Sequence, residues 1–482
     1  MTGYTSSVQV YLALQRYDAA VAVGNCPDNI PGDTASSRSG VQAKYGNPSA
    51  IQKRSSGQNQ IVNQNADASF FGSIAVGTPP VAYDVILDTG SSDLWLAGST
   101  CLSTACDGIP TFKPSLSSTF KNNSEPFQIT YGSGEAAGVL GQDVVQMAGF
   151  SVPNQVFAVC DDVSSGLLNT PVSGLLGLAF QTIASSGASP LWETLASSGS
   201  WDQPLMAFQL TRYNNDSKTQ TLLDSQTSTE VLNYGGTFTM GATNSSLFTG
   251  EIDYNPLPPN SESYWLQTIS CKCPSITSQG SAITISSGSS ALAAIDTGTT
   301  LVGGPEEEIA AIYANIPGSA VGTGQFEGYY TYPCSTTVTV TMAFGGKSWA
   351  ISNDDFQAQV LSKTSCLGAF FSLSTGSNAP AWIVGDTFLK NVYSVYRFNP
   401  PAVGFAQLSA TATALSGNDA LVVPSPTTGA AATVIASSGS SPSHKANSNG
   451  AGSIFVSSPS SLSSALSIQI LVIAMTMLFY SL

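Results

Sequence analysis

Two short segments of the chain share a pattern in which an aspartate follows an apolar run and precedes a threonine and a glycine. The first, VILDTGSS, contains Asp88, and the second, AAIDTGTT, contains Asp296. An apolar segment, Leu-Leu-Gly or Ile-Val-Gly, follows each aspartate and ends at Gly177 or Gly385, in both cases 89 residues after the aspartate. Two copies at one spacing predict a chain built from two related halves.

A carboxylate at the end of an apolar strand is partly desolvated and must be stabilised by hydrogen-bond donors, which the residues around each aspartate can supply. Each segment offers a glycine N–H that can turn back to its own carboxylate, a threonine hydroxyl that can reach the other half, and a further hydroxyl for the outer carboxylate oxygen. In that order, these residues are Gly90, Thr89 and Ser91 in the first segment and Gly298, Thr297 and Thr299 in the second.

Two such carboxylates placed face to face would lie within reach of one water molecule. Because like charges at this distance do not both ionise readily, Asp88 and Asp296 are expected to share a proton over an acidic range. One aspartate then acts as a base on the water and the other as an acid on a carbonyl oxygen. The pattern therefore predicts peptide hydrolysis without a covalent intermediate.

The composition excludes several other classes of protein. The chain has 482 residues with 15 basic and 30 acidic side chains, and the net charge of −15 argues against nucleic acid as a partner. Charged residues make up only 9% of the chain, against about 25% in an average domain, which suits an acidic medium. The single histidine, His444, lies in a Ser-rich tail, so we expect no His-based catalytic pair, no metal site and no cofactor.

The region from Phe70 to Ala410 has the character of an all-β fold. Short runs rich in Val, Ile, Thr, Tyr and Phe alternate there with Gly, Pro, Asn and Ser turns. Representative predicted strands are Val81–Leu87, Thr336–Met342 and Tyr393–Phe398, and the best helix candidates are Leu191–Ser197 and Pro305–Ile316.

Several motifs of this region resemble the pepsin-like aspartic proteases, in particular secreted or GPI-anchored fungal endopeptidases. Besides the two aspartate segments, they are Phe71-Gly72, Gly77–Pro80, Asp88–Trp95, Tyr131–Gly134, Gly174–Ala179, Tyr264-Trp265 and Trp382–Asp386. The sequence departs from the family pattern at Asp93, usually Asn, and at Ser133, often Thr. The resemblance implies a bilobal all-β peptidase at 55–410, with lobes of about 70–245 and 246–410 and a cleft between them. It also implies peptide substrates, an acidic optimum and, because both motif copies lie in one chain, a monomer.

The resemblance also assigns roles to individual positions. Asp88 and Asp296 are the implied catalytic pair, with Thr89, Ser91, Thr297 and Trp95 as its support. Tyr131 is placed on a flap, a β-hairpin that closes over the substrate, and Trp95 is expected to bond the Tyr131 hydroxyl. The implied substrate-binding residues are Gly90, Tyr131, Gly132, Ser133, Gly298 and Thr299.

Cysteines and sequons fit a secreted protein. The resemblance implies two disulfides among the eight cysteines, Cys101–Cys106 and Cys334–Cys366. It does not determine the pairing of Cys26, Cys160, Cys271 and Cys273. One alternative is a disulfide from Cys160 to Cys271 or Cys273. Candidate glycosylation sites are Asn122, Asn215 and Asn244.

Residues 1–54 are expected to form a leader and propeptide. No secretory hydrophobic stretch is visible, so we expect the start to be truncated. Lys44 lies in a Lys-Tyr segment that resembles the part of family propeptides that blocks the cleft, and Arg54 ends a dibasic pair suited to processing. A Lys ammonium between two carboxylates would be released as acid protonates them. The sequence therefore predicts an inactive precursor cleaved after Arg54.

The C-terminal part is expected to tether the protein at the cell surface. Residues 411–465 form a stalk rich in Ser and Thr, and Leu466–Leu482 is an apolar run of 17 residues, shorter than the roughly 20 of a membrane helix. No charged residue follows Lys445, which favours a GPI signal over a membrane-spanning tail. Asn449 is the expected attachment residue, with neighbours from Asn447 to Ser453 as alternatives.

Two other functions compete with peptidase activity. One is a protease-like binding protein, which normally has a damaged Asp-Thr-Gly segment, whereas both segments here are intact. The other is a cell-wall glycoprotein, which would not explain the duplicated motifs. The sequence leaves cleavage specificity open between large apolar and basic residues, because one side chain changes such preferences by only about 1–3 kcal/mol.

Overall fold

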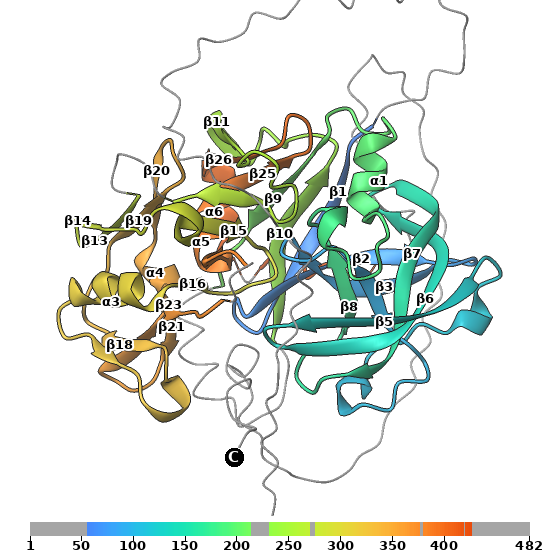
Figure 1. The fold of residues 1–482 in the computed structure, drawn as a ribbon, viewed down its shortest axis with the longest axis horizontal. Coiled ribbons are helices and arrows are strands. Elements are labelled where there is room, and N and C mark those ends of the chain that lie inside the picture. Colours follow the sequence, from blue (N-terminus) through green and yellow to red (C-terminus); the bar gives the residue numbers. More distant parts are fainter. Residues whose placement is uncertain (1–54, 214–230, 270–274, 376–378, 419, 427–482) are drawn as a thin grey trace, which may run out of the picture.

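A computed structural model describes residues 55–213, 231–269, 275–375, 379–418 and 420–426. Two β-rich lobes lie side by side, and strands from the middle and the end of the chain run between them (Figure 1). The N-terminal lobe contains the strands up to β8, and the C-terminal lobe contains those from β11 onward. The predicted bilobal all-β fold is confirmed.

The largest sheet joins the two lobes. Its 13 strands have the order β11-β26-β25-β9-β10-β1-β2-β3-β8-β4-β7-β6-β5. Strand β9 pairs with β10 on one side and with β25 on the other, so the C-terminal strands are continuous with the N-terminal ones. The bounds of these strands are β1 Gly57–Gln64, β2 Ser69–Val76, β3 Val81–Asp88, β4 Leu94–Ala97, β5 Lys121–Tyr131, β6 Gly134–Met147, β7 Phe150–Val163, β8 Val172–Gly177, β9 Leu205–Leu210, β10 Leu232–Met240, β11 Phe248–Pro256, β25 Val392–Arg397 and β26 Ala402–Leu408.

Three smaller sheets complete the C-terminal lobe. They have the orders β12-β15-β24-β16-β23, β14-β13-β19-β20 and β17-β18-β22-β21. Their strands are β12 Leu266–Thr268, β13 Ile276–Ser278, β14 Ser281–Ile283, β15 Leu292–Ile295, β16 Val302–Gly304, β17 Ala320–Val321, β18 Tyr330–Pro333, β19 Val340–Ala343, β20 Ser348–Ile351, β21 Gln357–Val360, β22 Ser365–Gly368, β23 Phe370–Ser372 and β24 Trp382–Val384.

Short helices lie at the edges of the sheets. They are α1 Leu191–Ser197, α3 Glu306–Ala314, α4 Asn353–Phe356, α5 Asp386–Leu389 and α6 Ala410–Leu415. Both helix candidates of the sequence, Leu191–Ser197 and Pro305–Ile316, are present as α1 and α3. Glutamates occupy the first turn of α3, where their negative charges interact favourably with the positive end of the helix dipole.

The folded unit continues beyond residue 410, where we expected the stalk to begin. Helix α6 buries Ala412 completely, and the N–H of Gly417 donates to the carbonyl of Arg212. Farther on, Val423 packs against a hydrophobic cluster of the N-terminal lobe. Apolar side chains of Ala412, Leu415 and Val423 therefore pack against the folded unit.

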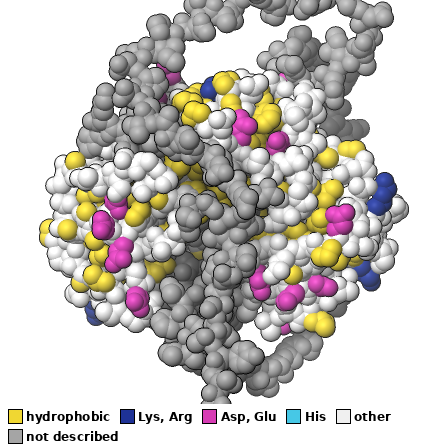
Figure 2. All heavy atoms as spheres, in the orientation of Figure 1, with side chains coloured by type: hydrophobic (Ala, Val, Ile, Leu, Met, Phe, Trp, Pro, Cys, Tyr) yellow, Lys and Arg dark blue, Asp and Glu magenta, His cyan; other side chains and the backbone are white. Residues whose placement is uncertain are grey.

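The surface is sparsely charged, and the core is continuous. One buried hydrophobic cluster extends from Ile61 in β1 to Phe405 in β26, so both lobes contribute to it. Figure 2 shows scattered acidic side chains and only a few basic ones on the described surface facing the viewer. In the part of the chain that the structure describes, no helix is both long and apolar enough to cross a membrane.

Candidate active site

Asp88 is the last residue of β3 and Asp296 directly follows β15, and each carboxylate is held by its own loop. Asp88 Oδ1 accepts a hydrogen bond from the Gly90 N–H at 2.7 Å, and Oδ2 accepts one from the Ser91 hydroxyl at 2.5 Å. Asp296 repeats the arrangement, with the Gly298 N–H at 2.8 Å and the Thr299 hydroxyl at 2.7 Å. The two carboxylates therefore lie in matching cradles of donors.

The two loops meet each other at their glycines. A Cβ atom at Gly90 would come within 2.5 Å of Asp296 Oδ2, and one at Gly298 would clash equally with Asp88 Oδ1. Each glycine is therefore needed because the opposite carboxylate lies directly against its backbone. This contact places the two acidic groups on either side of one small space.

Thr89 and Thr297 bind the two loops together. The Thr89 N–H donates to Thr297 Oγ1 at 3.1 Å, and the Thr297 N–H donates to Thr89 Oγ1 at 3.0 Å. Each hydroxyl then donates to a carbonyl of the other half, Thr89 to Ile295 at 2.8 Å and Thr297 to Leu87 at 2.6 Å. Both threonines are buried, so these four hydrogen bonds hold the loops without competition from water.

The strand behind each loop explains the second motif of each half. Strand β8 pairs in parallel with β3, with Gly177 opposite Asp88, and the Leu178 N–H donates to the Asp88 carbonyl at 2.7 Å. Strand β24 pairs in parallel with β15, and the Asp296 N–H donates to the Val384 carbonyl at 3.0 Å. The 89-residue spacing in the sequence thus corresponds to one structural arrangement used twice.

Burial and the opposite carboxyl group both act on Asp88. Its side chain is almost completely buried, and burial, followed by the neighbouring Asp296 carboxylate, raises its pKa well above the ordinary value. The hydrogen bonds from Ser91 and Gly90 act in the opposite direction but do not outweigh burial. Burial and the neighbouring carboxylate therefore both favour the protonated form of Asp88.

Strands β5 and β6 form a hairpin whose tip contains Gly132 and Ser133. Tyr131 and Gly134 are paired across the tip, and Gly132 is exposed. Trp95 is fully buried, and its Nε1–H donates to the Tyr131 hydroxyl at 2.8 Å. Burial first, then the charge of Asp88, raises the pKa of Tyr131, so the phenol lies near Asp88.

Two further ionisable groups near the aspartates were not singled out as site residues in the sequence. Tyr264 lies close to both, since its pKa is raised by burial and then by Asp296 and Asp88. Asp386, at the start of α5, is a buried carboxyl group whose pKa is raised well above its usual range, chiefly by burial. Both occur in motifs carried by the family resemblance, and only the fold shows their proximity to the site.

The two predicted disulfides, Cys101–Cys106 and Cys334–Cys366, are present. Cys160 is a buried thiol that has no disulfide partner among the described residues, and burial raises its pKa. In the same part of the chain, no group of three or more His, Cys, Asp or Glu side chains is arranged to hold a metal ion.

The remaining predicted positions lie either on the surface or outside the described residues. Asn122 and Asn244 lie on the described surface, and each side-chain oxygen accepts a hydrogen bond from the serine two residues later. Several expectations lie outside the described residues: those for Cys26, Lys44, Arg54, Asn215, Cys271, Cys273, Asn449 and the apolar tail Leu466–Leu482.

A two-lobed β fold with paired Asp-Thr-Gly loops at the junction defines the class of aspartic peptidases. Comparison with known proteins agrees, because the model of the eukaryotic aspartyl protease family matches residues 69–408. The chain belongs to this family and is an aspartic endopeptidase whose substrates are peptides.

Individual relatives are similar over most of the chain. Major aspartyl peptidase 1 of Cryptococcus neoformans var. grubii is 43% identical over 377 residues, 77% of this chain and 74% of that protein. An aspartic protease of Phaffia rhodozyma is 35% identical over 76% of this chain and 82% of its own length. Pepsin A of Sus scrofa is 33% identical over 71% of this chain and 82% of its own length.

Proposed function

We propose that this endopeptidase works in acid and that Asp88 and Asp296 together activate the attacking water. The observation that carries the proposal is the symmetry of the site. Each carboxylate accepts one backbone N–H and one hydroxyl from its own loop. The two hydrogen bonds between Thr89 and Thr297 then join the loops.

The proposed reaction needs one proton shared by the pair. The aspartate without the proton takes one from the water, which attacks the scissile carbonyl carbon. The protonated aspartate donates to the carbonyl oxygen, which gives a tetrahedral intermediate. The aspartate that took the proton from the water then passes it to the leaving nitrogen, while the other aspartate takes back a hydroxyl proton as the C–N bond breaks. The raised pKa of Asp88 supports this state, because the pair keeps its proton into weakly acidic conditions.

The hairpin of β5 and β6 is proposed to close over the bound peptide. Gly132 and Ser133 at its tip offer backbone groups to an extended substrate. The bond from Trp95 to Tyr131 orients the ring at the base of this tip, so closure brings Tyr131 toward the aspartates in a defined orientation.

The activity is tested by incubating the purified, processed protein with a denatured protein substrate over a pH series. Cleavage should be fastest below neutral pH, persist with a chelator present and stop with a statine-type transition-state mimic. A folded protein that binds the mimic but cleaves nothing would instead favour the protease-like binding protein.

We also propose that the enzyme is secreted as an inactive precursor and held at the cell surface as a monomer. The two disulfides support an oxidising compartment. The Lys-Tyr segment at Lys44 and the dibasic pair ending at Arg54 support a propeptide, and the uncharged C-terminus supports a GPI anchor near Asn449.

Two measurements test this part of the proposal. N-terminal sequencing of the active enzyme should give a start after Arg54, and a fully active form that retains Lys44 would contradict the propeptide. Phosphatidylinositol-specific phospholipase C should release the enzyme from membranes. Retention after the lipase, with Leu466–Leu482 still detected by mass spectrometry, would contradict the GPI anchor.

A further inference from the structure

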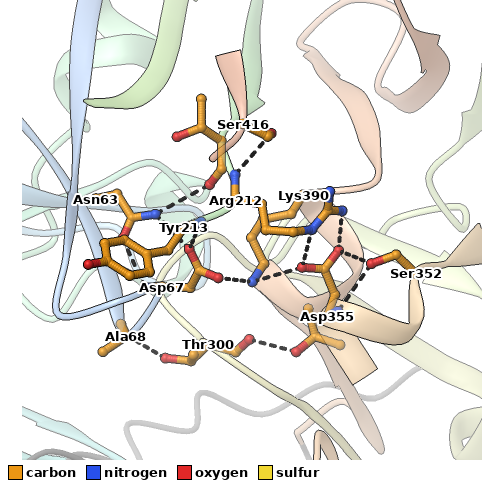
Figure 3. Close-up of polar contacts among 12 residues, drawn as sticks. Asn63, Asp67, Ala68, Arg212, Tyr213, Thr300, Ser352, Asp355, Lys390 and Ser416 are labelled. Carbon is orange, nitrogen blue, oxygen red and sulfur yellow. Dashed lines mark hydrogen bonds and ion pairs between the residues drawn. The ribbon is translucent and has the colours of Figure 1, made fainter. Parts of the chain in front are cut away.

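Four charged residues, three of them buried and Arg212 partly exposed, form a cluster between the two lobes (Figure 3). Lys390 Nζ lies 2.8 Å from Asp67 Oδ2 and 3.1 Å from Asp355 Oδ1. The exposed fractions of these three side chains are 5%, 4% and 0%. Arg212 completes the cluster through two bonds to Asp355, one of them from Nε at 2.8 Å, so two cations balance two carboxylates.

The pairing of Asp355 with Lys390 and Arg212 persists to a lower pH than an ordinary carboxyl group would allow. Burial alone would raise the pKa of Asp355, but Lys390 and then Arg212 outweigh it and hold that pKa below the usual value. Burial would also lower the pKa of Lys390, yet Asp355 and Asp67 raise it overall. Acid that protonates ordinary carboxyl groups therefore leaves the pairing with Asp355 intact.

The four residues come from distant parts of the fold. Asp67 belongs to the tight turn between β1 and β2 in the N-terminal lobe, and Arg212 follows β9. Asp355 lies in α4, and Lys390 follows α5. The cluster therefore joins an N-terminal turn to two helices of the C-terminal lobe.

The turn that presents Asp67 is itself strained. Asn65, Ala66 and Asp67 have φ angles of 53°, 58° and 72°, a left-handed run that is unfavourable above all for Ala66, which has no polar side chain to bond locally. Asn63 stabilises it, because its amide donates to Asp67 Oδ1 at 2.6 Å and its oxygen accepts the Asp67 N–H at 2.8 Å. The fold thus maintains an unfavourable backbone in the place where it directs a carboxylate at Lys390.

Direct contacts connect this turn and α5 to the loop of Asp296. The Thr300 hydroxyl, four residues beyond Asp296, donates to the carbonyl of Ala68 at 2.6 Å. The N–H of Asp386 donates to the Thr299 carbonyl at 2.8 Å, and the N–H of Thr387 to the Thr300 carbonyl at 2.9 Å. The loop is therefore held on one side by the N-terminal turn and on the other by the helix that leads to Lys390.

We propose that the Asp67–Lys390–Asp355–Arg212 cluster sets how the lobes meet, and that Lys390 and Thr300 are positioning residues for the aspartate pair. This proposal rests on the proposed function of Asp88 and Asp296. Buried ion pairs add little net stability compared with apolar packing, because desolvation offsets their attraction. A misplacement of about 1 Å at reacting groups costs on the order of 100-fold in rate, so a positioning role has a large effect.

Four variants separate positioning from stability. Thr300→Val removes only the hydroxyl that reaches Ala68, and Lys390→Met removes the shared cation. The double variant Lys390→Met/Asp67→Asn removes the charge that the single change leaves unpaired. Lys347→Met is the matched control, because Lys347 lies on the surface of the same lobe, over the ring of Trp349 at 4.4 Å. For each variant, kcat, KM and Tm are measured, with active molecules counted by titration with a tight-binding inhibitor.

The proposal predicts that kcat per active molecule falls by roughly 10- to 100-fold in Lys390→Met and severalfold in Thr300→Val, with KM little changed. In the double variant, Tm should recover toward the wild-type value while kcat stays low. The control should match the wild type in all three quantities. Two results would overturn the proposal. One is an unchanged kcat per active molecule in Thr300→Val together with an unchanged kcat in any Lys390 variant that folds. The other is a kcat that returns to the wild-type value together with Tm in the double variant. An inactive wild-type enzyme would contradict the proposed function itself, which keeps the two failures distinct.

Discussion

Thr89 and Thr297 exchange hydrogen bonds across the junction of the two lobes, each N–H donating to the other residue's hydroxyl oxygen at 3.1 and 3.0 Å. Each threonine follows one of the two aspartates. The geometry of the carboxyl pair is therefore fixed by a contact that neither lobe makes alone.

Replacing Thr297 by valine should weaken this junction. The change removes the hydroxyl that donates to the Leu87 carbonyl and accepts from the Thr89 N–H. Each of these two buried backbone groups is then left unpaired, which lowers the free energy of unfolding by about 1–3 kcal/mol per group. We expect a lower Tm and a lower kcat, measured by thermal unfolding and by steady-state cleavage. Ser278→Ala is the comparison, since the buried hydroxyl of Ser278 also donates to a carbonyl, that of Ile312, but within the C-terminal lobe alone. Equal effects of the two changes would contradict the special role of the junction.

The pair of Trp95 and Tyr131 should act as a unit in catalysis. Tyr131→Phe removes the acceptor of the Trp95 N–H, and Trp95→Phe removes the donor. Each change should lower kcat/KM, and the coupling in a double-mutant cycle should be about 0.5–1.5 kcal/mol, a few-fold to about tenfold in rate. Strictly additive effects would mean that the bond does not orient the hairpin.

The stability of the fold should fall as the pH rises toward neutrality, because of Asp84. This residue of β3 is 5% exposed, and burial raises its pKa to about 7 from 3.8. A raised carboxyl pKa stabilises the folded state fully below the unfolded value, and this contribution is lost as the pH rises through about 7. Between about pH 4 and pH 7.5, the Tm of Asp84→Asn should therefore fall less than that of the wild type. The corresponding difference in the free energy of unfolding is a few kcal/mol, about 1.4 kcal/mol for each unit by which the pKa is raised. Parallel Tm curves for the two proteins would rule out this assignment.

The two disulfides should contribute unequally to stability. Cys334 and Cys366 are separated by 32 residues and Cys101 and Cys106 by 5, so the first bond restricts the unfolded chain more. Loop-closure entropy predicts losses of about 3–4 kcal/mol and about 2 kcal/mol when each pair is replaced by alanine. Thermal unfolding of the two double variants checks the order, and a larger loss for the shorter loop would contradict it.

The sequence predicted the aspartate loops well because their chemistry is local. The glycine, threonine and hydroxyl residues that surround Asp88 lie within three positions of it, so their types and order carry the information. Strand lengths were less accurate: a strand was predicted over Thr336–Met342, but β19 begins only at Val340. The reason is that the N–H groups just before it bond to side chains, that of Val338 to Asn353 and that of Thr339 to Gln279.

The cluster around Lys390 could not be predicted from the sequence. Lys390 and Asp67 are 323 residues apart, and neither lies in a repeated or spaced pattern. The contact arises because the last strands of the chain join the same sheet as the first. The packing of Ala412, Leu415 and Val423 could not be predicted for a similar reason, since a composition rich in Ser, Thr and Ala does not show which residues contact the lobes.

The proposed mechanism needs both aspartates, each for a separate proton transfer. The most direct test measures kcat at acidic pH for Asp88→Asn and Asp296→Asn, with Asp202→Asn as an exposed control and Tm to verify folding. Each site variant should fold normally and lose on the order of 1000-fold or more in kcat, while the control keeps wild-type activity. Wild-type kcat in either folded site variant would contradict the account.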